Sequence, residues 1–169
     1  MATIVFFRAV NVGGHQTFQP ARLAKELAAF EVVSIGAAGT FVVRAKVPAA
    51  RLRAEILRRL PFAPEMMFCP GAAIVKLVQE SEFGRAEGAA AGERFVSVLA
   101  RTPRTLPPLP YEYPAGNRWE VQLVACVGPL VLSRRRPGRT YANAVVEKHF
   151  GLAATTRNWN TITTIAKYC

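Results

Sequence analysis

The chain has 169 residues, of which 51% are hydrophobic and 20% are charged. This length suits one domain or two small subdomains that pack as one, and it is enough to bury a stable core. No apolar run approaches the roughly 20 residues of a membrane-spanning helix, and the first residues lack the pattern of a secretory signal. We therefore expect a cytoplasmic protein that does not bind membranes.

The charge is strongly positive, with a formal net charge of +11 and 17 arginines among the 22 basic residues. Such a chain attracts polyanions such as nucleic acid. The alternative is a surface whose arginines only reflect the base composition of a GC-rich genome. All 11 acidic residues are glutamates, which excludes aspartate-based catalytic triads and aspartate-rich Ca²⁺ loops.

Few residues could hold a metal ion or form a disulfide. The histidines are His15 and His149, and the cysteines are Cys69, Cys126 and Cys169, with no CxxC spacing. We expect no metal site and no cofactor. An odd number of thiols cannot all pair, so we expect free thiols, with Cys69 and Cys126 shielded in apolar strands.

The first half of the chain alternates short apolar runs with amphipathic segments. A buried strand is predicted at 3–8, and Leu23 and Leu27 lie at helical spacing after Pro20. The other expected elements are strands at 31–36 and 40–45, a helix from Pro48, a strand at 65–69 and a helix at 72–80. This is the split β-α-β-β-α-β order of ferredoxin-like folds, so residues 1–81 are expected to form a ferredoxin-like subdomain.

Residues 82–93 lack periodicity and predict a linker, and residues 94–169 predict a second α+β subdomain. Prolines exclude a helix over much of 101–117. The other expected elements are strands at 94–100, 118–125 and 130–136, a helix from 139 that ends at Gly151, and a last helix capped by Asn158 or Thr156. The fold class is therefore α+β, with a related mixed-sheet second half that ends in two helices.

The loop after the first strand is one candidate ligand site. In "FRAVNVGG" a strand end is followed by a Gly-Gly pair and then by a helix, and such a loop can bring backbone N–H groups close to an anion. The candidate residues are Arg8, Asn11, Gly13 and Gly14. A plain turn that uses the glycines for positive φ explains the pattern equally well.

The polar segment "TTRNWNT" is a second candidate ligand site. Its hydrogen-bonding side chains exceed what helix capping requires, and a helix start favours an anion. The candidate residues are Thr156, Arg157, Asn158, Asn160 and Thr161. In the structural alternative, Asn158 or Thr156 caps the helix and Trp159 anchors the core.

"SRRRPGR" is a candidate nucleic-acid-binding segment, because several guanidinium groups at a strand end can grip phosphates. The candidate residues are Arg134, Arg135, Arg136 and Arg139. The predicted helix from Pro48 carries a second basic set, which consists of Arg51, Arg53, Arg58 and Arg59. The alternative is a solvated charge cluster, and in both cases we expect these charges to add little to stability.

Two stretches also resemble a known family. "FFRAVNVGG" and "NAVVEKHFGLAATTRNWNTITTIA" are similar to the bacterial family catalogued as domain of unknown function 1697, and the similarity covers nearly the whole chain. It implies an α+β fold with a ferredoxin-like first half and a related second half, and it implies no established activity. The chain departs from the family pattern at several positions, which weakens any catalytic role. These positions are Ala9, His15–Thr17, Ala38, Thr40 and the pair Arg139 and Thr140.

No catalytic residue can be assigned from the sequence. No GxSxG motif is present, and Glu147 and His149 lie two apart on a predicted helix, so their side chains diverge. We expect a binding module for an anionic ligand or for nucleic acid. The alternatives are an enzyme that acts on a small phosphorylated or carboxylated substrate, and a structural or partner-binding protein without chemistry.

Overall fold

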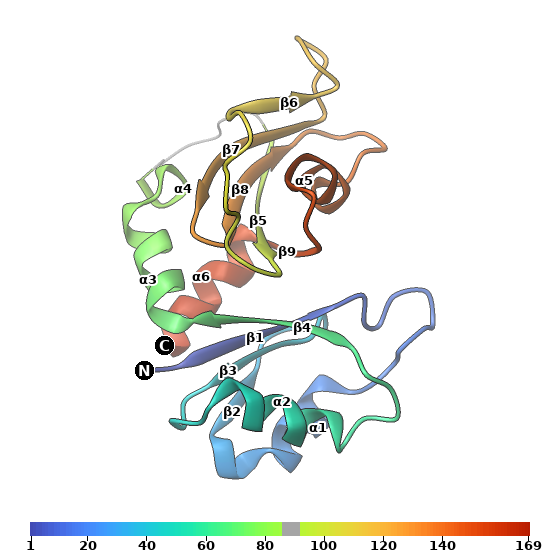
Figure 1. Cartoon of the computed structure of the whole chain (residues 1–169), viewed down its shortest axis with the longest axis vertical. Coiled ribbons are helices and arrows are strands. Elements are labelled where there is room, and N and C mark those ends of the chain that lie inside the picture. The colour runs from blue at the N-terminus through green and yellow to red at the C-terminus, as the bar shows by residue number, and fades with distance from the viewer. Residues whose placement is uncertain (86–91) are drawn as a thin grey trace. The chain divides into compact units, whose positions relative to one another are not determined.

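The computed structural model describes residues 1–85 and 92–169, which form two compact units (Figure 1). The first unit consists of Met1–Val78 together with Thr163–Cys169, and the second unit is Gln79–Ile162. The sequence places residues 94–169 in one subdomain, whereas in the structure Thr163–Cys169 belongs with the first unit. Within the described residues, no helix combines the length and the apolar character that crossing a membrane requires.

The first unit is built around a four-stranded antiparallel sheet in the order β2-β3-β1-β4. Its elements are β1 (Thr3–Arg8), α1 (Pro20–Glu26), the 3₁₀ helix η1 (Ala28–Phe30), β2 (Val32–Ser34), β3 (Thr40–Val43), α2 (Ala49–Leu57), β4 (Glu65–Pro70) and most of α3 (Gly71–Glu80). The strands and helices follow the chain order that the sequence predicts. The α+β class is confirmed, and the finer ferredoxin-like assignment stays a prediction.

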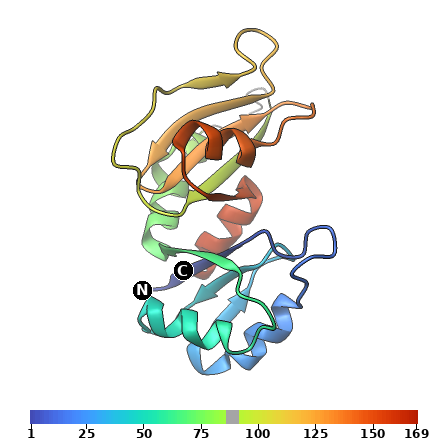
Figure 2. The ribbon, with the colours of Figure 1, turned by 45° about the vertical axis from the view of Figure 1, so that its right-hand side comes forward.

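The core of the first unit lies between this sheet and the helices α1 and α2, which cover the same face (Figure 2). Strand residues alternate between the two faces of a sheet, so Val5 and Phe7 of β1 both belong to this core. The ring of Phe7 lies 5.2 Å from the ring of Phe41. Gly39 permits this packing, because a Cβ there would lie 2.9 Å from the Cβ of Phe7.

The second unit is built around a five-stranded sheet in the order β6-β7-β8-β5-β9. Its elements are α4 (Glu82–Arg85), β5 (Glu93–Leu99), β6 (Tyr111–Tyr113), β7 (Val121–Val127), β8 (Leu130–Arg135), α5 (Ala142–Phe150), β9 (Ala154–Asn158) and the first part of α6 (Trp159–Tyr168). Every pairing among the described strands is antiparallel, so this sheet is not a mixed one. Val145 and Val146 of α5 pack on Leu123 and Val131 of the sheet.

The two sheets share a strand order. The run β7-β8-β5-β9 repeats β2-β3-β1-β4, with β5 in the position of β1 and with α5 in the chain position of α2. One element differs, because α1 follows β1 whereas the described residues 100–120 contain no helix. Prolines in this segment lack the N–H groups that a helix needs. In the second unit, a Pro-rich segment and β6 thus connect β5 to β7, where α1 lies between β1 and β2 in the first unit.

Part of the predicted linker is structured. Glu82–Arg85 forms the short helix α4, Phe83 within it is only 1% exposed, and Glu93 begins β5. The linker prediction for residues 86–91 falls outside the described residues. Phe83 is the one large apolar side chain of the segment, and a single aromatic residue gives no periodic signal in the sequence.

The segment "TTRNWNT" begins as a strand, not as a helix start. β9 pairs with β5 from Ala154 to Asn158, so Thr156 is a strand residue and caps no helix. Asn158 does cap α6, because its Oδ1 accepts the backbone N–H of Thr161 at 2.8 Å. β-Branched threonines favour the strand, and β5 supplies the partner that the sequence alone does not reveal.

Candidate functional site

The loop after β1 is tied together by its own polar groups. Asn11 donates from Nδ2 to the carbonyl of Ala37 at 3.2 Å, and its Oδ1 accepts the N–H of Phe18 at 2.9 Å. Arg8 forms a 3.4 Å ion pair with Glu65. Gly13 and Gly14 adopt φ of +57° and +76°, which is the conformation of the plain-turn alternative.

A pocket of about 510 Å³ lies against this loop, and Asn11 and Gly14 belong to its lining. The remaining lining residues are Thr17, Phe18, Gln19, Pro20, Ala21 and Ala37, none of which is charged. The adjoining helix α1 has only seven residues, so the dipole at its start is weak. This loop therefore borders a cavity, but the cavity lining has no charged side chain that would attract an anion.

The polar side chains of "TTRNWNT" are largely engaged within the second unit. The hydroxyl of Thr156 lies 2.6 Å from the Ser97 hydroxyl and donates to Oδ1 of Asn143 at 2.8 Å. Arg157 is 7% exposed, and its NH1 donates to the Thr155 hydroxyl and to the carbonyl of Thr156, both at 2.9 Å. Burial lowers the pKa of the Arg157 guanidinium to about 10.

Of the other candidates in this segment, Asn158 and Thr161 form the cap of α6, and Asn160 is exposed. Arg8, Asn11, Gly13 and Gly14 belong to the first unit, whereas Thr156–Thr161 belongs to the second. The two predicted ligand sites therefore lie in different units. In each of them, most of the polar side chains form hydrogen bonds that stabilise their own unit.

The first three arginines of "SRRRPGR" also have partners inside the protein. Arg134 donates from NH2 to Glu82 at 2.9 Å. Arg135 donates to the carbonyls of Thr140 and Gly138 at 2.8 and 3.0 Å. The side chains of Arg134 and Arg135 are 19% and 20% exposed. These two side chains therefore do not fit the alternative interpretation of a solvated charge cluster.

Arg136 and Arg139 differ sharply in their surroundings. The guanidinium of Arg136 lies 3.6 Å from the centre of the Trp119 ring and donates to the carbonyl of Asn117 at 3.0 Å. Arg139 is exposed, and its side chain has no partner among the described residues. Only one of the four predicted nucleic-acid-binding arginines is thus free to meet a ligand.

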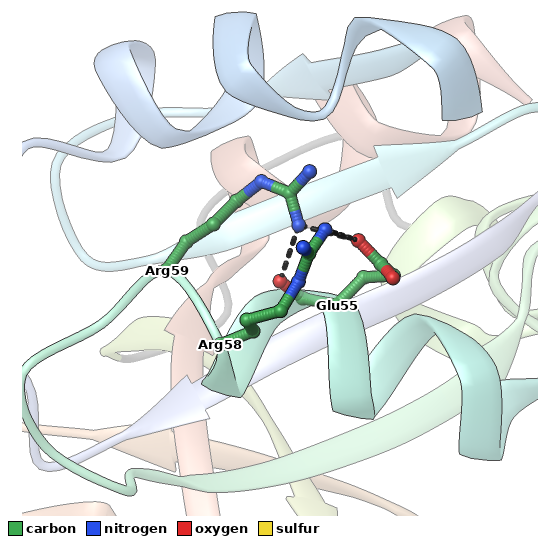
Figure 3. Close-up of polar contacts among 3 residues, drawn as sticks. All are labelled: Glu55, Arg58 and Arg59. Carbon is green, nitrogen blue, oxygen red and sulfur yellow. Dashed lines mark hydrogen bonds and ion pairs between the residues drawn. The ribbon is translucent and has the colours of Figure 1, made fainter.

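The basic face of α2 is partly neutralised by Glu55. Figure 3 shows the side chains of Arg58 and Arg59 converging on this carboxylate, with the Arg58 contact at 2.7 Å. Hydrogen bonds from Arg59 and then Arg58 lower the pKa of the Glu55 carboxyl. Arg53 donates to the carbonyl of Met66 at 3.1 Å. Much of this basic set is therefore also engaged within the first unit.

A pocket that the sequence does not predict lies between β6 and α5, within the second unit. It has a volume of about 390 Å³. Tyr111 and Tyr113 line it from β6, Thr140 lines it from the loop before α5, and α5 contributes Ala144, Val145, Lys148 and His149. Residues two apart on a strand share a face, as do residues three or four apart on a helix, so the two elements present these side chains together.

The aromatic wall of this pocket is held in place. The rings of His149 and Tyr111 are stacked, with centres 3.9 Å apart and planes 21° apart. Nε2 of His149 lies 2.9 Å from the carbonyl oxygen of Pro108. Tyr113 remains 39% exposed. The ring of Tyr111 is thus held by His149, whereas Tyr113 remains partly accessible to solvent.

The charge in this pocket comes from Lys148, which is exposed and has no ion pair or hydrogen bond among the described residues. None of the neighbouring glutamates lines the pocket, and each accepts a hydrogen bond. Glu112 accepts a hydrogen bond from Gln122 at 3.0 Å, and Glu147 accepts the N–H of Ala154 at 2.9 Å. Glu120 accepts the N–H of Thr140 at 2.8 Å. Hydrogen bonds from Thr140 lower the pKa of the Glu120 carboxyl.

No group of three or more histidine, cysteine or glutamate side chains capable of holding a metal ion occurs within residues 1–85 and 92–169. The pocket lining contains no serine and no cysteine. The arrangement combines an apolar, aromatic cavity with one accessible cation. Such a cavity can hold an organic anion.

The overall fold resembles that of a solved bacterial structure. The conserved bacterial protein SP0830 from Streptococcus pneumoniae aligns with a TM-score of 0.59 at 13% sequence identity, over 98% of this chain and 97% of that chain. A likeness at this identity supports the fold alone. No family model matches the chain, and a search of curated proteins also finds no match. The family resemblance of the sequence therefore stays a prediction.

Proposed function

We propose that the chain is a binding module for a small organic anion, and that this ligand occupies the pocket between β6 and α5. The observation that carries the proposal is Lys148, a cation without a described partner in a cavity otherwise lined by tyrosine, histidine, threonine and apolar side chains. A charge acts more strongly beside apolar walls than in open water, so this lysine favours an anionic group in the cavity.

The charge of the whole chain acts in the same direction. A net charge of +11 raises the local concentration of anions around the protein. The glutamates of β6, α5 and the segment before β7 do not belong to the pocket lining, in which Lys148 is the lysine. Nucleic-acid binding by the arginine run has less support, because Arg134, Arg135 and Arg136 already have internal partners.

The test uses two fluorescent probes of similar shape. The anionic probe is 8-anilinonaphthalene-1-sulfonate, and the neutral probe is N-phenyl-1-naphthylamine. The variant Lys148→Gln should weaken binding of the anionic probe by roughly tenfold, the effect expected when one charge-assisted contact is lost. It should leave binding of the neutral probe nearly unchanged.

The matched control is Lys25→Gln, which removes an exposed lysine of α1 in the first unit and changes the net charge equally. This variant should bind both probes as the parent protein does. Equal weakening by the two variants would show that the probe senses only the net charge. Unchanged anion binding by Lys148→Gln would also overturn the proposal.

A further inference from the structure

We propose that the ligand of this pocket is a nucleoside phosphate, either a free mononucleotide or a nucleotide of a single strand. The inference rests on the proposed anion-binding function and adds the chemistry of the ligand. Its basis is the juxtaposition of an open aromatic ring, Tyr113, with a cation that has no described partner, Lys148.

The aromatic side of the pocket suits a flat base. Tyr111 and Tyr113 lie on the same face of β6, and both line the cavity. His149 already covers one face of Tyr111, whereas Tyr113 is 39% exposed. Bases stack on exposed tyrosine rings with little dependence on sequence, because every base has a π face.

This aromatic surface is preorganised. The stack of His149 on Tyr111 is fixed at its other end by the contact between Nε2 and the Pro108 carbonyl. On the opposite face of β6, Glu112 is bonded to Gln122 of β7. A surface that is ordered before binding loses less entropy when the ligand arrives.

The cationic side suits a phosphate. Lys148 lines the pocket, and its ammonium group has no ion pair or hydrogen bond among the described residues. A lysine ammonium group is a point charge and a common ligand of phosphate. A fatty acid or a simple inorganic anion would use the charge without the aromatic ring, whereas a nucleotide uses both.

The size of the cavity limits the form of the ligand. A volume of about 390 Å³ lies within the range of roughly 300–1,000 Å³ that is usual for small-molecule sites. In a duplex the bases are stacked inside and cannot reach a tyrosine without flipping. The ligand is therefore a free nucleotide or an unpaired one.

The experiment measures binding of adenosine 5′-monophosphate, adenosine and inorganic phosphate by calorimetry at low salt. Adenosine 5′-monophosphate should bind more tightly than either of its parts. Tyr113→Ala should weaken its binding by about tenfold, within the range measured for base stacking, and should leave phosphate binding unchanged. Lys148→Gln should weaken binding of the nucleotide and of phosphate, but not of adenosine.

The matched control is Tyr168→Ala, which removes a tyrosine of equal exposure, 39%, from the first unit and should leave nucleotide binding unchanged. A labelled single-stranded oligonucleotide separates the two sources. Tighter binding of the oligonucleotide, with the same loss in Tyr113→Ala, assigns the site to a single strand. Tighter binding of the monophosphate assigns it to the free nucleotide.

The inference is overturned if adenosine 5′-monophosphate binds no better than phosphate, or if Tyr113→Ala binds it as well as the parent protein does. Competition with 8-anilinonaphthalene-1-sulfonate separates this failure from failure of the proposed function. If binding of this probe depends on Lys148 but the nucleotide does not displace the probe, the anion site is retained and the nucleotide is rejected as its ligand. If binding of the probe does not depend on Lys148, both the proposed anion site and the nucleotide inference are rejected.

Discussion

The rings of Phe83 and Trp159 meet edge to face, with centres 5.5 Å apart and planes at 85°. Both side chains are buried, at 1% and 6% exposure. Trp159→Ala should therefore lower the free energy of unfolding by about 3–5 kcal/mol, because it removes buried surface and leaves a cavity. Chemical denaturation measures the loss. Trp159→Phe, which keeps an aromatic ring, should lose less, and a loss under about 1 kcal/mol for the alanine variant would place the ring outside the core.

The arginine run should matter to stability more than an exposed charge cluster would. Arg135→Gln should lower the free energy of unfolding by about 1–2 kcal/mol, because the carbonyls of Thr140 and Gly138 lose their donors. Arg139→Gln should change it by less than about 0.5 kcal/mol, as is usual for an exposed site. Urea titrations of the two variants would give equal midpoints if the run were only a solvated cluster.

The thiols should react in a definite order with Ellman's reagent. Cys169 is exposed, Cys126 is half-buried and Cys69 is buried. Burial raises the pKa of the Cys69 thiol to about 11, so little of the reactive thiolate is present at neutral pH. We expect Cys69 to react last in the native protein and Cys169 first. Cys169→Ser should remove the fastest phase, and its persistence in that variant would contradict the order.

The stabilising effect of Glu55 should depend on pH in one direction. The adjacent Arg59 and Arg58 hold the pKa of its carboxyl below its usual value of 4.5 (Figure 3). A folded-state pKa below the unfolded one stabilises the fold above that usual value, and the contribution is lost as the pH falls through the folded-state pKa. The melting temperature should exceed that of Glu55→Gln at pH 7, and the difference should vanish on acidification. A constant difference would exclude this linkage.

Strong local signals made most of the fold predictable from sequence. The apolar run of β1 and the positions of Pro20, Pro48 and Gly151 mark elements that the structure contains. β9 escaped prediction because its polar threonines pair with a strand far away in the chain. Phe83 escaped because a single aromatic residue gives no periodic signal, and because its partner Trp159 is also far away in the sequence.

The candidate site was much less accessible to sequence reasoning. Tyr111 and Tyr113 stand among prolines, and only the pairing of β6 with β7 places them beside α5. The visible signal was the alternation "YEY", which indicates a short strand with two tyrosines on one face. Arg136, in contrast, was predicted to bind nucleic acid but packs inside the unit. The local sequence does not show that Trp119 lies beneath its guanidinium.

On the ribosome, the first unit is begun before the second and completed after it, because it includes Thr163–Cys169. Arg44 donates from Nε to the carbonyl of Tyr168 at 3.2 Å, and its guanidinium lies 5.7 Å from the centre of that residue's ring. A nascent chain that ends at Val78 lacks these partners. The first unit therefore cannot complete its fold until the second unit has been synthesised. During this interval the surface that Thr163–Cys169 will cover is accessible to chaperones and proteases.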